Sequence, residues 1–147
     1  LDATGQHGLI AATVDQSARI LWYNNGIIRF TGATGDGLYA GAMNTTLIVA
    51  TQIADDEYGN FAAKVCANYS VTVDGVTYGD WYLPSKYELN LLCTHRTAVG
   101  GFTNEFYLSS TESERFPHFA WGQLFYDGKQ SELNKTFNYY VRAIRAF

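Results

Sequence analysis

The sequence predicts an α+β domain from three observations. A strand-like segment runs directly into a capped helix at residues 79–92, a second amphipathic helix pattern spans residues 55–70, and residues 102–147 alternate short strand-like segments with polar loops. Because both helices lie between β segments, we expect them to pack on short, mainly antiparallel strands. The chain has 147 residues, of which 47% are hydrophobic. That is enough for one core, so we expect a single domain over residues 1–147.

The start of the helix in the 79–92 segment is marked twice. Pro84 disfavours helical geometry at Leu83, which keeps the chain extended up to that point. Ser85 and Glu88 have the S-x-x-E spacing of a capping box, in which each side chain bonds the backbone amide of the other residue. The helix then shows one apolar stripe at i, i+3, i+4 spacing, formed by Leu89, Leu92 and Cys93.

The helix over residues 55–70 is predicted from three carboxylates in its first turn and an apolar face behind them. A calcium site is the alternative interpretation of this acidic run. We disfavour it because three consecutive carboxylates point to different sides of a helix. A shorter helix is predicted from Asn44 through residue 50, after a glycine-rich surface loop at residues 31–41.

The strands are predicted from β-branched and aromatic segments bounded by turn residues. Asp74-Gly75 and Asp127-Gly128 are typical of tight hairpin turns. The expected strands are residues 9–14, 20–23, 71–73, 76–78, 81–83, 106–108, 119–125 and 139–147.

The two cysteines leave two alternatives open. Cys66 and Cys93 lie near the ends of the two main predicted helices. If those helices pack together, a disulfide would stabilise the fold by about 3 to 4 kcal/mol. Two buried thiols are the other alternative, since spacing along the chain does not show whether the Cβ atoms meet.

No catalytic signature is present, and we expect a noncatalytic protein without a cofactor. His7, His95 and His118 are scattered, and the sequence contains no metalloprotease, C-x-x-C, G-x-S-x-G or P-loop motif. The hydroxyl run at residues 109–111 is expected to bond backbone groups. A net charge of −4 argues against unspecific nucleic-acid binding, and no segment is long and apolar enough to insert into a membrane.

Candidate ligand residues lie in two loops of the second half, residues 112–118 and 126–138. Cations and rings interleave there, a mixture suited to sulfated or acidic glycans, although an ordinary solvated surface would have the same composition. The candidates are Arg115, Phe116, His118, Tyr126, Lys129 and Lys135. If they do not bind, the 31–41 loop with Lys86 and Arg96 is the next candidate. Arg142 and Arg145 lie inside a predicted strand, where we expect structural ion pairs.

The string DWYLPSKYEL at residues 80–89 resembles the hallmark of a bacterial domain found at the C-terminus of the Legionella collagen-like protein and in related surface proteins. Further matches to that family follow in the same order along nearly the whole chain. They lie at residues 7–12, 22–24, 31–35, 44–46, 100–102, 108–112, 119–121 and 140–147.

This resemblance implies a C-type-lectin-like fold in which the terminal strands pair. It also implies a secreted adhesin head on the bacterial cell surface that binds glycosaminoglycans such as heparin, forms a homotrimer on a collagen-like stalk, and serves host attachment and biofilm formation. We therefore expect this chain to be the C-terminal head of a longer protein. The alternatives are a head that binds a host or phage protein, and a structural trimer cap.

Calcium-dependent sugar binding, the best-known use of such folds, is disfavoured by the residues. Pro84 and Pro117 lack the flanking oxygen ligands of that chemistry, and the Trp-Asn-Asp that supplies further ligands is replaced by Trp121-Gly122-Gln123. We expect glycan binding without calcium.

Overall fold

The computed structural model describes residues 4–147 as a mixed α+β domain, which confirms the predicted class. Its helices are α1 (Ala40–Gln52), α2 (Ala62–Ala67), α3 (Lys86–Thr94) and α4 (Arg96–Val99). Its strands are β1 (Leu9–Ala11), β2 (Ser17–Ile20), β3 (Val71–Val73), β4 (Val76–Tyr78), β5 (Phe106–Glu112), β6 (Phe119–Leu124), β7 (Gln130–Asn134), β8 (Tyr139–Val141) and β9 (Ile144–Ala146). Within the described residues, no helix has the length and hydrophobicity needed to cross a bilayer.

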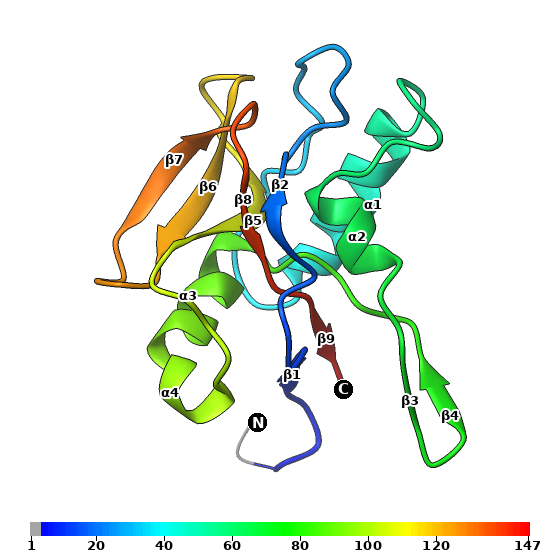
Figure 1. Ribbon diagram of the computed structural model, residues 1–147, viewed down its shortest axis with the longest axis vertical. Coiled ribbons are helices and arrows are strands. Elements are labelled where there is room, and N and C mark those ends of the chain that lie inside the picture. The colour runs from blue at the N-terminus through cyan, green and yellow to red at the C-terminus, as the bar shows by residue number, and fades with distance from the viewer. Residues whose placement is uncertain (1–3) are drawn as a thin grey trace.

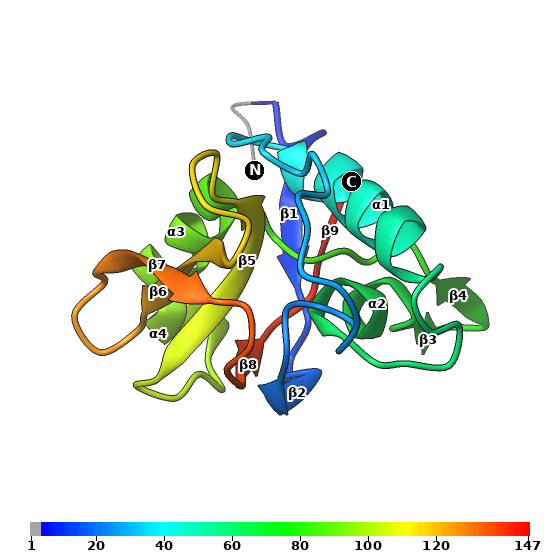
Figure 2. The same ribbon diagram turned by 90° about the horizontal axis from the view of Figure 1, so that it is seen from above.

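The main sheet has five strands in the order β2-β8-β5-β6-β7 (Figure 1). Its pairs are antiparallel except β5 with β8, where Tyr107 pairs with Tyr140 in parallel register. The first and last strands pair antiparallel, with Leu9 opposite Ala146, as expected for the terminal strands. Figure 2 shows this β1–β9 pair running between two groups of elements, with α3 and α4 on the side of β5 to β7 and α1 and α2 on the other side.

The capping box at the start of α3 is confirmed. The Ser85 hydroxyl accepts from the Glu88 amide at 3.2 Å, and the Glu88 carboxylate accepts from the Ser85 amide at 2.8 Å. The same buried carboxylate also accepts from the Tyr39 amide at 2.8 Å and the Gly41 amide at 3.2 Å. Glu88 therefore joins the start of α3 to the start of α1.

The helix predicted over residues 55–70 is wrong in extent, because α2 covers only Ala62–Ala67. The segment before it is held as a loop, since the Asn24 side-chain amide donates to the backbone carbonyls of Gln52 at 2.9 Å and Asp56 at 2.7 Å. Phe61 is fully buried in extended geometry and ends this loop. Residues 81–83 also differ from the prediction: they form a single bridge, from Tyr82 to Ile144, instead of a strand.

The two cysteines are free thiols, so the disulfide alternative is wrong. Cys66 packs in a cluster around Trp22, Phe61 and Leu83, whereas Cys93 packs in a second cluster with Leu89, Tyr107 and Phe125. Burial raises the pKa of the Cys66 thiol. Both cysteines serve as small apolar core residues.

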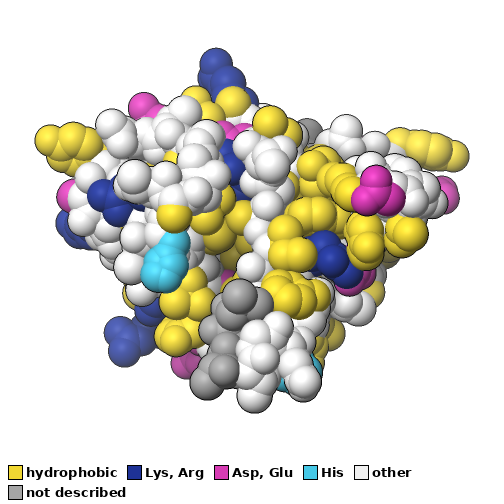
Figure 3. Space-filling model, turned by 90° about the horizontal axis from the view of Figure 1, so that it is seen from below, with side chains coloured by type: hydrophobic (Ala, Val, Ile, Leu, Met, Phe, Trp, Pro, Cys, Tyr) yellow, Lys and Arg dark blue, Asp and Glu magenta, His cyan; other side chains and the backbone are white. Residues whose placement is uncertain are grey.

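Both predicted hairpin turns are confirmed. Asp74 and Gly75 have φ values of 50° and 80° and join β3 to β4, and the second turn joins β6 to β7. The β3–β4 ribbon has one apolar face, formed by Val71, Val73, Val76 and Tyr78. The ribbon projects at the lower side of the molecule in Figure 1, and Figure 3, seen from below, shows apolar side chains gathered on that lower side.

Arg142 and Arg145 both make structural ion pairs, as predicted, although Arg142 lies in the connection between β8 and β9 and not inside a strand. Arg142 is fully buried, and its guanidinium donates to Asp15 at 2.6 Å and to the carbonyls of Ala12 and Gly101 at 2.9 and 2.6 Å. Arg145 donates to both carboxylate oxygens of Asp80 at 2.7 and 2.9 Å. Neither arginine is free for a ligand.

Candidate functional site

The six predicted ligand residues do not form one surface. Arg115, Phe116 and His118 lie in the connection from β5 to β6, whereas Tyr126 and Lys129 lie in the turn from β6 to β7. These connections are at opposite ends of β6, which has six residues and therefore spans about 20 Å. All five are exposed, but one small ligand cannot contact both groups.

Lys135 is a correction to the prediction, because only 1% of it is exposed. Its ammonium forms an ion pair with the buried Glu112 carboxylate and donates to the Arg29 carbonyl at 3.3 Å. It also lies 4.2 Å from the centroid of the Trp22 ring. Burial lowers the pKa of Lys135, and the Glu112 carboxylate opposes that effect. Lys135 is a structural cation and is not available to a ligand.

The Glu112–Lys135 pair orders the beginning of the glycine-rich loop. The Glu112 carboxylate accepts from the amides of Thr31 at 2.8 Å and Gly32 at 3.1 Å. Residues 29–32 are thereby attached to β5 and to the end of β7. Over residues 4–147, no three His, Cys, Asp or Glu side chains are grouped so as to hold a metal ion.

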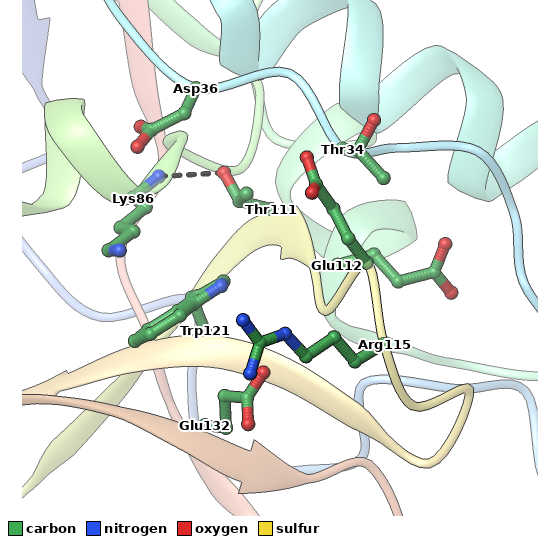
Figure 4. A pocket seen from close by; sticks show the side chains of 9 residues that line it. Thr34, Asp36, Lys86, Thr111, Glu112, Arg115, Trp121 and Glu132 are labelled. Atoms are coloured by element: carbon green, nitrogen blue, oxygen red, sulfur yellow. Dashed lines mark hydrogen bonds between the residues drawn. The ribbon is translucent and has the colours of Figure 1, made fainter.

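A pocket of about 440 Å³ lies beside this ion pair, on the side of β6 and α3 (Figure 4). Four parts of the chain meet there: the glycine-rich loop, the start of α3, the end of β5 with its following loop, and the strands β6 and β7. The lining residues are Thr34, Asp36, Lys86, Thr111, Glu112, Glu114, Arg115, Trp121 and Glu132. Of the predicted ligand residues, only Arg115 lines this pocket.

Two cations flank a single indole ring in the pocket. The Lys86 ammonium lies 3.4 Å from the centroid of the Trp121 ring, and the Lys86 amide donates to the Thr111 hydroxyl at 2.9 Å. Arg115 extends from the other side toward Trp121 and Glu132 (Figure 4). The ring and the two cations come from β6, α3 and the β5–β6 loop, so the fold alone brings them together.

The loop that carries Arg115 is shaped by Ser113. The Ser113 hydroxyl donates to Glu132 at 2.7 Å and accepts from the amides of Arg115 and Phe116, both at 3.2 Å. One buried hydroxyl thus attaches the β5–β6 loop to β7. This contact holds the backbone of Arg115 at the edge of the pocket.

The hydroxyl run of β5 bonds backbone groups, as predicted. Ser109 donates to the Trp121 carbonyl at 2.7 Å, Ser110 to the Pro84 carbonyl at 3.2 Å, and Thr111 to the Gly35 carbonyl at 2.9 Å. These hydroxyls connect β5 to the surrounding elements. Their protons are engaged with carbonyl oxygens.

The charges of the pocket limit what it can bind. Glu112 is neutralised by Lys135, which leaves the cations Lys86 and Arg115 beside the carboxylates of Asp36, Glu114 and Glu132. Such a mixture can bind one anionic group between the cations and accept hydrogen bonds from neighbouring hydroxyls. Away from the two cations the carboxylates repel further anionic groups, so a polyanionic chain would enter this pocket with one anionic group at a time.

The next candidates from the sequence were the 31–41 loop, Lys86 and Arg96, and only some of them lie at this pocket. Thr34 and Asp36 of the 31–41 loop line the pocket together with Lys86. Arg96 lies elsewhere, where its guanidinium donates to the Cys93 carbonyl at 2.7 Å. Trp121 was not a predicted ligand residue, and from the sequence its binding role was considered only within the Trp121-Gly122-Gln123 segment, which lacks calcium ligands.

Comparison with known proteins gives no assignment: no protein-family model matches this chain, and no curated protein matches its sequence. The fold established here is α+β with a mainly antiparallel sheet.

Proposed function

We propose that this chain is a noncatalytic, C-type-lectin-like adhesin domain that binds acidic polysaccharides, including sulfated glycosaminoglycans, without calcium. The observation that carries this proposal is the placement of Lys86 and Arg115 on either side of Trp121 in one open pocket. Display on a bacterial cell surface and assembly as a homotrimer rest on the family resemblance and belong to the same proposal.

The anionic group of the sugar binds between the two cations. The planar Arg115 guanidinium donates to two oxygens of a sulfate or carboxylate, and the Lys86 ammonium supplies a second charge-assisted contact. Trp121 offers to the C–H face of the sugar ring the part of its apolar area that the Lys86 ammonium does not cover. The carboxylate of Glu132 accepts from a sugar hydroxyl, which selects a saccharide over a bare inorganic anion.

Calcium is not needed for this binding. In calcium-dependent lectins the ion orders a ligand loop, and here the Lys135 ammonium lies between the Glu112 carboxylate and the Arg29 carbonyl next to the glycine-rich loop. A built-in cation thus takes the ordering role of the metal.

Heparin binding measured by calorimetry tests the proposal. Replacing Lys86 and Arg115 together by alanine removes two charge-assisted contacts, each worth about 1.5 to 3 kcal/mol before solvent screening. We expect the dissociation constant to rise at least tenfold. Lys129→Ala is the matched control, because it removes a positive charge at the opposite end of β6, and it should bind within about twofold of the parent.

Two outcomes would contradict this proposal. If the Lys86 and Arg115 double variant binds heparin as tightly as the parent, the pocket is not the site. If the parent binds no member of a glycan array, the alternatives of a head for a host or phage protein and of a structural cap take precedence.

A further inference from the structure

A second groove lies next to the pocket, on another side of the start of α3. It has a volume of about 400 Å³ and is bounded by β1, α3, α4 and the end of the glycine-rich loop. Asp36 and Lys86 line the pocket, whereas their near neighbours in the chain, Leu38 and Tyr87, line the groove. Consecutive residues of an α-helix point about 100° apart around its axis, so Lys86 and Tyr87 reach different cavities. We call the second cavity the tyrosine groove, because Tyr39 and Tyr87 both line it.

The ridge between the pocket and the tyrosine groove is fixed by hydrogen bonds from the glycine-rich loop to α3. The Asp36 carboxylate accepts from the Tyr87 amide at 2.8 Å. The Ser85 hydroxyl donates to the Gly37 carbonyl at 2.7 Å. Because Asp36 lines the pocket and Tyr87 lines the groove, a chain-like ligand that crosses this contact reaches both cavities.

The backbone of Tyr39 is held in an unfavourable conformation. Its φ is 67°, in the left-handed region that residues with a bulky side chain rarely adopt. The buried Glu88 carboxylate keeps it there, because it accepts from the amides of Tyr39 at 2.8 Å and Gly41 at 3.2 Å. Strained residues of this kind cluster at ligand sites, which favours a role for the Tyr39 ring.

Both tyrosine rings are accessible to a ligand. Tyr39 and Tyr87 are 42% and 47% exposed. Among residues 4–147, neither phenol hydroxyl has a hydrogen-bond partner. An exposed phenol ring offers apolar area to the C–H face of a sugar, and its hydroxyl can exchange hydrogen bonds with the hydroxyls of the sugar.

The charges of the tyrosine groove favour a neutral sugar. Within the part of the chain that the structure describes, no lysine or arginine lines it. Its one carboxylate, that of Glu88, is fully buried and already accepts from backbone amides. The pocket, in contrast, contains Lys86 and Arg115. An anionic group is therefore stabilised in the pocket, whereas in the groove it would lose its hydration without gaining a charged donor of that kind.

We propose that the ligand is a polysaccharide in which an acidic sugar is followed by a neutral one. The acidic sugar binds in the pocket, and the neutral sugar packs against Tyr39 and Tyr87 in the tyrosine groove. The Asp36 carboxylate on the ridge repels an anionic group between the two cavities, which favours the same spacing of charge. This inference rests on the proposed function and names the class of polysaccharide that the site prefers.

Calorimetry with two hexasaccharides at physiological salt tests the preference for spaced charge. In hyaluronan a uronate alternates with a neutral N-acetylglucosamine, whereas in heparin nearly every sugar carries an anionic group. We expect the parent to have the lower dissociation constant for the hyaluronan hexasaccharide, because only its neutral sugars suit the tyrosine groove.

Two variants test the tyrosine groove itself. Tyr87→Ala keeps the backbone amide that bonds Asp36, and asparagine in Tyr39→Asn tolerates the left-handed backbone. Each variant should raise the dissociation constant for the hyaluronan hexasaccharide about fivefold. The matched control is Tyr58→Ala, which removes an 87% exposed ring that lines neither cavity and should bind within about twofold of the parent. Circular dichroism checks that each variant is folded.

The outcomes separate this inference from the proposed function. If both tyrosine variants bind hyaluronan like the parent, or if the parent prefers the heparin hexasaccharide, the inference is overturned and the proposed pocket stands. The Lys86 and Arg115 double variant tests the pocket alone, and unchanged binding by that variant overturns the proposed function. A parent that binds neither hexasaccharide overturns both.

Discussion

The buried ion pair between Lys135 and Glu112 gives the sharpest stability prediction. Lys135→Met keeps the length of the side chain and its packing over Trp22 but removes the ammonium. The Glu112 carboxylate then stays buried, with only its hydrogen bonds to Thr31 and Gly32. Breaking one partner of a buried pair costs about 3 to 5 kcal/mol. For a chain of this size the melting temperature should fall by about 10 °C or more.

The double variant Lys135→Met, Glu112→Gln separates the charge effect from the packing effect. Glutamine keeps an oxygen that accepts from the Thr31 and Gly32 amides and carries no charge. We therefore expect the double variant to recover at least half of the stability lost by Lys135→Met. Chemical denaturation with urea gives both free energies of unfolding.

Lys129→Met is the matched control, because Lys129 is exposed in the β6–β7 turn. It should change the free energy of unfolding by no more than about 0.5 kcal/mol. The reasoning is refuted if Lys135→Met is as stable as the parent, or if the double variant is less stable than Lys135→Met alone.

Three further predictions concern pH, the thiols and calcium. The hydrogen bond from Arg145 holds the pKa of Asp80 below its usual value. The ionised Asp80 therefore stabilises the folded state above about pH 4, and this contribution is lost as the pH falls through the folded-state pKa of Asp80. Asp80→Asn should therefore flatten the acid side of the urea stability profile, by less than about 1 kcal/mol because Asp80 is more than half exposed; a steeper acid side would contradict this. Iodoacetamide at pH 8 should leave Cys66 unmodified in the native state and label it after unfolding, as read by mass spectrometry, since burial raises the pKa of that thiol. EDTA should leave the melting temperature and heparin binding unchanged, and a loss that calcium restores would count against binding without the metal.

Structural features that depend on residues close together in the chain were predictable from the sequence. The capping box of Ser85 and Glu88 and the turn at Asp74 depend on residues within three positions of one another, so tertiary packing has little room to alter them. The backbone bonding of the β5 hydroxyls also followed from their place inside a strand. The ion pair of Arg142 was predicted, but the strand expected over residues 139–147 is interrupted at Arg142.

The candidate site was only partly predictable, because its members meet through the fold. Lys135 stands in a polar stretch that reads as exposed, and its burial depends on a carboxylate that β5 supplies. Lys86 and Trp121 are far apart in sequence and come into contact only where α3 packs against β6. The helix predicted over residues 55–70 failed for a similar reason, since Asn24 holds part of it as a loop.

The pairing of β1 with β9 has a consequence for how the chain folds. Leu9 meets Ala146 only after nearly the whole chain has been made, so this ladder cannot form early during synthesis. The parallel contact between β5 and β8 also joins distant parts of the chain. Such non-local pairing slows folding, because the entropy cost of closing a long loop comes before the new contacts stabilise the fold. Since β1 and β9 lie side by side, a circularly permuted chain that links the two strands and opens in the exposed β3–β4 turn should reach the same fold faster.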